Sequence, residues 1–156
     1  MEQPSEHIKF EVSYSIYLAE MTETFNRRIN QFFTFLQFLL GASISGDIRY
    51  GWLLGFLIAC ISAIQFTVKF GERSGNAKSQ VRRYRRLADE LPKLDEDQIK
   101  VRMQEIEESD PRTLTSLYNP ARKRASIALY GIDREAEHPL TRWEQIVAFI
   151  SGGIPK

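Results

Sequence analysis

Two long uncharged stretches constrain the possible folds of this chain more than any other feature. Residues 29–46 (INQFFTFLQFLLGASISG) and 50–68 (YGWLLGFLIACISAIQFTV) contain no Asp, Glu, Lys or Arg, whereas most charged residues follow residue 68. As helices, the stretches would extend about 27 to 29 Å, close to the roughly 30 Å hydrocarbon thickness of a bilayer. Only a short turn, Asp47-Ile48-Arg49, separates them. The sequence therefore predicts an antiparallel helical hairpin that crosses a membrane twice, with spans over residues 29–46 and 50–69.

The alternative is a soluble all-α domain with two apolar helices at its centre. A helix that faces water carries polar or charged residues at every turn, and neither stretch shows a charged stripe. The rest of the chain is too short to cover both helices on all sides. The first stretch is the weaker span, because Asn30 and Gln37 are unfavourable in lipid unless another helix supplies hydrogen-bond partners.

Basic residues predict the orientation of the hairpin. Arg27 and Arg28 precede the first span and many Lys and Arg residues follow the second, against Arg49 alone in the turn. By the positive-inside rule, both termini are expected on the cytoplasmic side. The single cysteine, Cys60, lies inside the second span and offers no disulfide framework, which fits a reducing compartment.

A polar stripe runs down the first span and continues on the second. Its members are Asn30, Thr34, Gln37, Gly41 and Ser45 on the first span, with Ser62 and Gln65 on the second. These side chains either hydrogen-bond across the hairpin or an oligomer interface, or line a water-filled path formed by several copies. The residue types alone leave both interpretations open.

Small residues recur at every fourth position of the second span, at Gly51, Gly55, Ala59 and Ala63. Such a ridge lets another helix backbone approach closely within a membrane. We therefore expect this face to pack against a helix.

The N-terminal segment, residues 1–28, is expected to be cytoplasmic. Within it, HIKFEVSYSIYLAEM has an alternation typical of a strand and also a helical stripe. The helix is favoured, because no pairing strand is evident and the segment runs directly into the first span.

A cytoplasmic helical region is predicted over residues 71–131. Its first part, GERSGNAKS, reads as a junction broken by glycines, and QVRRYRRLADEL follows as a helix that Pro92 ends. The predicted apolar face of this helix consists of Val81, Tyr84, Leu87, Ala88 and Leu91. The helix carries an arginine cluster consisting of Arg82, Arg83, Arg85 and Arg86. We interpret the cluster as an anionic-lipid contact rather than a nucleic-acid site, because no groove-reading motif accompanies it.

Capping signals mark the later helices. Asp95 with Gln98 forms a capping-box variant ahead of Ile99, Met103 and Ile106, and Thr141 with Glu144 forms another box. Asn119 as N-cap, Pro120 at the first helical position and Gly131 after the last turn bracket a further helix.

The C-terminal segment, residues 132–156, contains a short amphipathic helix. Its predicted apolar face consists of Trp143, Ile146, Val147 and Ile150. This helix either docks on its own cytoplasmic layer or a neighbouring subunit, or it lies along the membrane interface with Trp143 at headgroup depth.

The residues predict no catalytic site, no metal site and no cofactor. His7 and His138 lie far apart in polar stretches, and SGNAKS lacks the Gly-Lys-Ser/Thr ending of a phosphate loop. Paired carboxylates such as Glu107 and Glu108 belong to a charged helix surface. An enzymatic function is therefore not expected.

The layout of RRINQFFTFLQFLLG, GWLLGFLIACISAIQFTVKF and QVRRYRRLADEL, over roughly residues 10–131, resembles the SLATT domains, two-span effectors of bacterial conflict systems. The resemblance implies a homo-oligomeric pore in the bacterial inner membrane. It also implies that a sensor partner opens the pore during infection, often through a nucleotide second messenger. A non-conducting, membrane-anchored adaptor whose cytoplasmic helices bind a partner protein is the alternative.

Overall fold

The regular secondary structure is helical throughout the part of the chain that the computed structural model describes, residues 4–44, 48–108, 113–133 and 138–155. The α-helices are α1 (Glu6–Ile44), α2 (Gly51–Val68), α3 (Phe70–Glu90), α4 (Glu96–Glu107), α5 (Tyr118–Tyr130) and α6 (Arg142–Ile150). Short 3-10 helices are η1 (Ile48–Tyr50), η2 (Leu91–Lys93) and η3 (Thr115–Leu117). The predicted all-α class is confirmed, and residues 8–16 are helical rather than extended.

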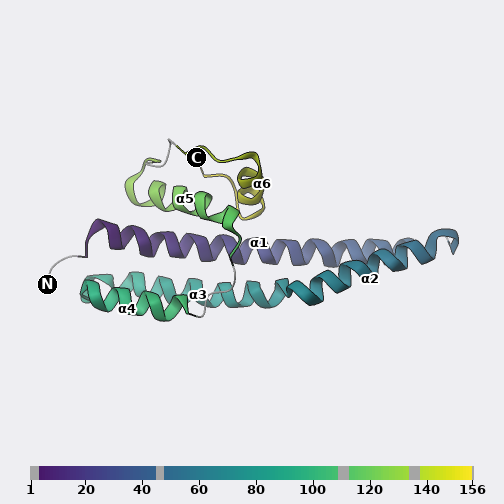
Figure 1. The fold of residues 1–156 in the computed structure, drawn as a ribbon, viewed down its shortest axis with the longest axis horizontal. Coiled ribbons are helices and arrows are strands. Elements are labelled where there is room, and N and C mark those ends of the chain that lie inside the picture. The colour runs from purple at the N-terminus through teal and green to yellow at the C-terminus, as the bar shows by residue number, and fades with distance from the viewer. Residues whose placement is uncertain (1–3, 45–47, 109–112, 134–137, 156) are drawn as a thin grey trace.

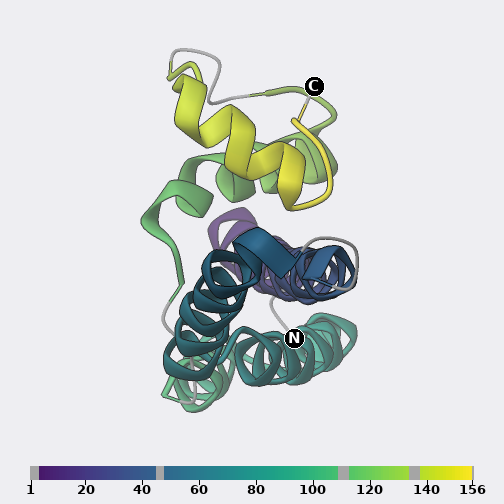
Figure 2. The same cartoon turned by 90° about the vertical axis from the view of Figure 1, so that its right-hand side faces the viewer.

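Helix α1 is the axis of the molecule. Its N-terminal part lies between two layers, with α3 and α4 on one side and α5 and α6 on the other (Figure 1, Figure 2). Its C-terminal part pairs with α2 and projects away from these layers. We call the projecting part, residues 29–44 with α2, the rod, and the remainder the head.

The first core of the head joins α1, α3 and α4. Ile8, Val12 and Ala19 of α1 contribute to it, and α3 adds the buried side chains of Tyr84 and Leu87. The predicted inward residues of α4 complete this cluster, and they are Ile99, Met103 and Ile106. The predicted apolar faces of α3 and α4 are therefore confirmed.

A second core lies on the opposite side of α1. Met21 of α1 is fully buried there, against Leu117 of η3 and Ala121 of α5. Val147 and Ala148 of α6 close the cluster. Because α1 supplies residues to both cores, it holds the two layers together.

The capping interactions predicted at Asp95, Thr141 and Gly131 are confirmed. Asp95 accepts a hydrogen bond from the backbone N–H of Gln98 at 2.8 Å, and the Gln98 side chain accepts one in return. Thr141 and Glu144 form the same reciprocal pair at the start of α6. Gly131 ends α5 with a φ of 71°, a left-handed conformation that glycine adopts without steric strain.

The glycines of GERSGNAKS do not interrupt the helix, so the prediction of a junction broken by glycines is wrong. Helix α3 runs through Gly71 and Gly75 without interruption. A helical glycine costs only about 1 kcal/mol, and the packing of α3 against α1 exceeds that penalty. The break falls earlier, at Lys69, whose φ of 56° is left-handed and separates α2 from α3.

The prediction of Asn119 as an N-cap is wrong. Helix α5 begins at Tyr118 and follows directly from η3, so Asn119 lies inside the first turn. The N–H of Tyr118 donates to the Thr115 carbonyl, so the preceding 3-10 turn satisfies an N–H group at the helix start that a side-chain cap would otherwise bind. The prediction of Pro120 as the first helical residue is wrong as well, since it is the third residue of α5. It still lies in the first turn, where its missing N–H leaves no helical bond unmade.

Candidate functional site

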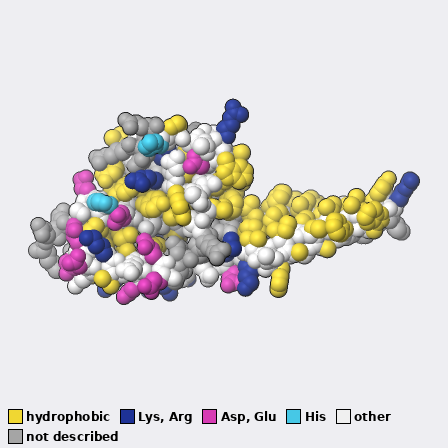
Figure 3. Space-filling view, viewed as in Figure 1, with side chains coloured by type: hydrophobic (Ala, Val, Ile, Leu, Met, Phe, Trp, Pro, Cys, Tyr) yellow, Lys and Arg dark blue, Asp and Glu magenta, His cyan; other side chains and the backbone are white. Residues whose placement is uncertain are grey.

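The outer surface of the rod is apolar and uncovered. Its large hydrophobic side chains are between 40 and 82% exposed. They are Phe32, Phe35, Phe38, Leu39, Trp52, Leu53, Phe56, Leu57, Ile64 and Phe66. Hydrophobic side chains cover much of the visible face of the rod, chiefly along its upper side, nearly to the tip (Figure 3). Soluble monomers rarely expose apolar patches larger than a few hundred Å², so this surface indicates contact with lipid or with other protein.

Length and composition identify one helix that could cross a membrane among the described residues. It is the stretch Gly51–Lys93, which contains α2 and α3, and none of its most apolar part is buried. Helix α1 is not identified in this way, because its uncharged part within the described residues, 29–44, is short and contains Asn30, Gln31 and Gln37, which lower its hydropathy. The predicted second span is thus supported by composition, whereas the first is not confirmed.

Polar side chains join the two helices of the rod. The Gln37 Nε2 donates to Ser62 Oγ at 2.9 Å, and Ser62 in turn donates to a carbonyl of its own helix. The Gln65 Nε2 lies 3.4 Å from both Asn30 Oδ1 and Thr34 Oγ1. We call these five side chains the interhelix clamp. Of the other predicted stripe residues, Gly41 is half-buried in α1 and Ser45 lies outside the described residues.

The clamp is open along its outer edge. Thr34 and Ser62 are exposed, while Gln37 and Gln65 are half-buried. Each exposed hydroxyl also donates to a carbonyl one turn earlier in its own helix. The polar groups are therefore bonded within one hairpin, and a second molecule or water could still reach that edge.

The small-residue ridge is not the contact between α1 and α2. Gly51 and Gly55 are half-buried, whereas Ala59 and Ala63 are exposed. A Cβ placed on Gly55 would meet no atom within 4 Å, so no backbone approaches closely there. Packing of this ridge against a helix stays a prediction, and the partner helix would have to come from another molecule.

The α3 arginines lie away from the rod. Arg82, Arg83, Arg85 and Arg86 are all exposed, and Arg85 forms an ion pair with Glu20 at 2.5 Å. At 1.5 Å per residue, even the first of them lies about 18 Å along α3 from Phe70, where α3 begins just beyond the rod. That distance exceeds the Debye length of about 8 Å in physiological salt. It disfavours our interpretation of this cluster as a lipid contact beside the rod.

The residues predicted as one apolar face of α6 lie on two sides of the helix, one buried and one exposed. Val147 is 1% exposed and docks on the head, together with Ala148, which the sequence reasoning missed. Trp143 and Ile146 are 63% and 51% exposed, and Ile150 is half-buried. Docking of α6 on its own head is therefore observed. A second, outward face exists as well, and Phe149 belongs to it with 68% exposure.

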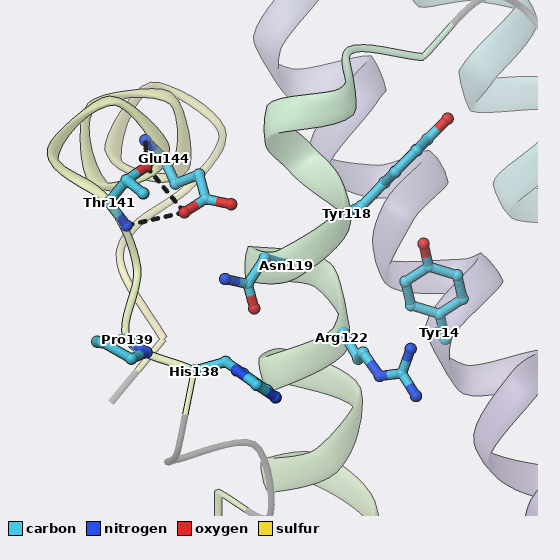
Figure 4. A pocket seen from close by; sticks show the side chains of 8 residues that line it. All are labelled: Tyr14, Tyr118, Asn119, Arg122, His138, Pro139, Thr141 and Glu144. Atoms are coloured by element: carbon cyan, nitrogen blue, oxygen red, sulfur yellow. Dashed lines mark hydrogen bonds between the residues drawn. The ribbon is translucent and has the colours of Figure 1, made fainter.

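A pocket of about 770 Å³ lies in the head between α1, α5 and the start of α6 (Figure 4). Its lining residues are Tyr14, Tyr118, Asn119, Arg122, His138, Pro139, Thr141 and Glu144. Burial raises the pKa of Tyr14; nearby Tyr118 raises it further, and Arg122 opposes the shift. Thr141 and Glu144 bond to each other as the α6 cap, so these polar groups serve the helix start.

No family model matches this sequence, and no match was found among curated proteins or among solved structures. Within the described residues, no group of three or more His, Cys, Asp or Glu side chains lies close enough to hold a metal ion. The fold and the rod define the class of the protein. It is a helical protein that has, among the described residues, one helix long and apolar enough to cross a membrane.

Proposed function

We propose that this chain is an integral membrane protein whose rod is inserted in a bilayer and whose head remains in water. The observation that carries the proposal is the uncovered apolar surface of the rod, which has no charged residue between residues 29 and 44 or within α2. Helix α2 has 18 residues, or about 27 Å, which suits a bilayer core. The interhelix clamp supplies the partners that its polar side chains need in lipid.

The proposed orientation follows from the cations beside the rod. Arg27 and Arg28 precede it and Lys69 and Arg73 follow it, whereas Arg49 is the cation of the tip. The N-terminal part of α1 and the C-terminal helix α6 both belong to the head (Figure 1). By the positive-inside rule, the head is cytoplasmic. The resemblance to SLATT domains implies that this membrane is a bacterial inner membrane.

The function that this geometry supports best is membrane anchoring of a helical head, and we propose a partner protein as the ligand of that head. The clamp favours this reading, because its polar groups hold the hairpin together within one chain.

The second candidate is a pore formed by several copies, as the SLATT resemblance implies. The open edge of the clamp favours it, since exposed Thr34 and Ser62 could face water at the centre of an assembly. A sensor protein or a nucleotide second messenger would then control opening.

Insertion can be tested with the single cysteine. Cys60 is exposed and lies near the middle of α2. In membranes it should resist a water-soluble maleimide and react only after detergent denaturation. The matched control is Cys60→Ser with Val101→Cys, which moves the thiol to a 57% exposed position in α4 and should react at once. Equal labelling of both thiols in intact membranes would refute insertion.

Anchor and pore differ in conductance. We would measure the mass of the protein in detergent and the leakage of an ion-sensitive dye from vesicles that contain it. The pore would be established by a large defined oligomer that leaks, provided that Thr34→Leu abolishes the leakage and leaves the mass of the oligomer unchanged. A monomer or dimer without leakage would leave the anchor.

A further inference from the structure

The outward face of α6 is an exposed apolar patch on the head. Trp143, Ile146 and Phe149 follow one another at intervals of three residues, so they share one side of the helix. The opposite side is fixed, because Val147 and Ala148 are buried against α1 and η3. The patch therefore cannot turn inward without undoing the second core of the head.

Arg28 places this helix at the junction of head and rod. Its Nη1 donates to the carbonyls of Phe149 and Ile150, at 3.2 and 2.9 Å. A cation at the C-terminal end of a helix is favourable, because the last carbonyls lack partners within the helix. Arg28 directly precedes the uncharged residues of α1. The end of α6 is thus level with the start of the rod.

The orientation of α6 agrees with this position. Figure 2, viewed from the tip of the rod, shows α6 lengthwise, so it runs across the axis of α1. In Figure 3, hydrophobic side chains gather over α6 on the edge of the head that faces the tip. The patch and the apolar surface of the rod therefore adjoin each other.

We propose that α6 lies flat on the surface of the bilayer that the rod enters, with Trp143, Ile146 and Phe149 at the boundary of headgroups and acyl chains. The inference rests on the proposed insertion of the rod. Interfacial helices bury an apolar face at this depth, and tryptophan is enriched there. At the outer end of α2, Trp52 is 74% exposed and Tyr50 is 54% exposed. Aromatic residues thus mark both ends of the rod.

Charge complementarity selects anionic headgroups. Arg142 is the first residue of α6 and is exposed, and Lys69, which forms an ion pair with Glu72 at 3.2 Å, lies where α2 ends. Cations at this level attract an anionic leaflet. A helix as short as α6 binds membranes weakly alone, but the rod tethers it, which raises its effective concentration at the surface.

The two tryptophans allow a direct test, because each reports one end of the rod. Full-length protein carrying Trp52→Phe would be placed in vesicles of phosphatidylcholine and phosphatidylglycerol, some with lipids brominated near the headgroup or near the chain ends. We expect Trp143 emission to fall most with shallow bromines and to resist acrylamide. The comparison protein, Trp143→Phe, reports Trp52, which shallow bromines should also quench if the rod is inserted.

A control reporter combines both Trp→Phe changes with Val101→Trp, on exposed α4, and should respond to acrylamide but not to bromine. If Trp52 is quenched by bromine while Trp143 responds only to acrylamide, insertion stands and the inference for α6 is wrong. If Trp143 resists both quenchers, a protein surface or a second copy covers the patch, which also overturns the inference. Bromine quenching of neither tryptophan would refute the inserted rod itself.

Discussion

A charge introduced at Cys60 separates a membrane-inserted rod from a soluble one by the size of its effect. Cys60 is exposed and lies near the midpoint of the 18-residue helix α2. In water, Cys60→Arg changes an exposed helix position and should alter the free energy of unfolding by no more than about 0.5 kcal/mol. In a bilayer, the same substitution places a guanidinium at the depth where it is least favourable.

The magnitude follows from the composition of α2. Arginine at the centre of a span disfavours insertion by about 2.5 to 3.5 kcal/mol, which corresponds to about a 70- to 400-fold shift in the insertion equilibrium. The nine Leu, Ile, Phe and Val residues of α2 together favour insertion by about 3 to 5 kcal/mol. One arginine therefore removes most of the driving force that these residues supply.

The assay is the fraction of full-length protein that resists alkaline carbonate extraction from membranes. We expect a large fall for Cys60→Arg and no change for Cys60→Leu, which keeps the position apolar. Val101→Arg, on the exposed surface of α4, controls for added charge and should have no effect. The reasoning would be refuted if the wild type and the Cys60→Arg variant partitioned alike, both of them as folded, soluble proteins.

Three further outcomes test the head and the clamp. Met21→Ala removes a fully buried side chain from the second core and should lower the free energy of unfolding by about 2 to 5 kcal/mol in chemical denaturation, whereas Val101→Ala should change it little. A double-mutant cycle of Gln37→Leu and Ser62→Ala, measured by unfolding the protein in a detergent titration, should give a coupling free energy of about 0.6 kcal/mol. Zero coupling would contradict the clamp. The raised pKa of Tyr14 means that the folded head holds its phenolic proton more tightly than the unfolded chain, so stability should fall as pH rises through the tyrosine range, and Tyr14→Phe should flatten that fall in a thermal melt.

Features that depend on neighbouring residues along the chain could be predicted from the sequence. The capping boxes at Asp95 and Thr141 involve residues three positions apart, so their geometry needs no tertiary contact. The apolar faces of α3 and α4 follow in the same way from helical periodicity. The polar stripe forms hydrogen bonds across the hairpin, which was one of its two interpretations. Gln37 and Gln65 each have a partner at the same level on the other helix.

Features that depend on packing could not be predicted. Gly71 and Gly75 resemble helix breakers in sequence, but α3 packs along α1 and runs through both without a break. The arginine cluster of α3 follows the second span closely in sequence, yet an unbroken helix carries it away from the rod. The two faces of α6 are also set by tertiary contacts, since only the core formed with Met21 decides that Val147 turns inward.

One turn of α1 connects these separate observations. Asn26 is buried and donates to the carbonyl of Thr22, Arg27 pairs with Glu23, and Arg28 holds the end of α6. Immediately afterwards the same helix becomes uncharged and enters the rod. Because α1 passes this point without a break, the orientation of the head relative to the rod is set by a continuous helix. The second connection bends at Lys69. A movement of α2 relative to the head would therefore be absorbed at Lys69, while α1 and the attached α6 remain one unit.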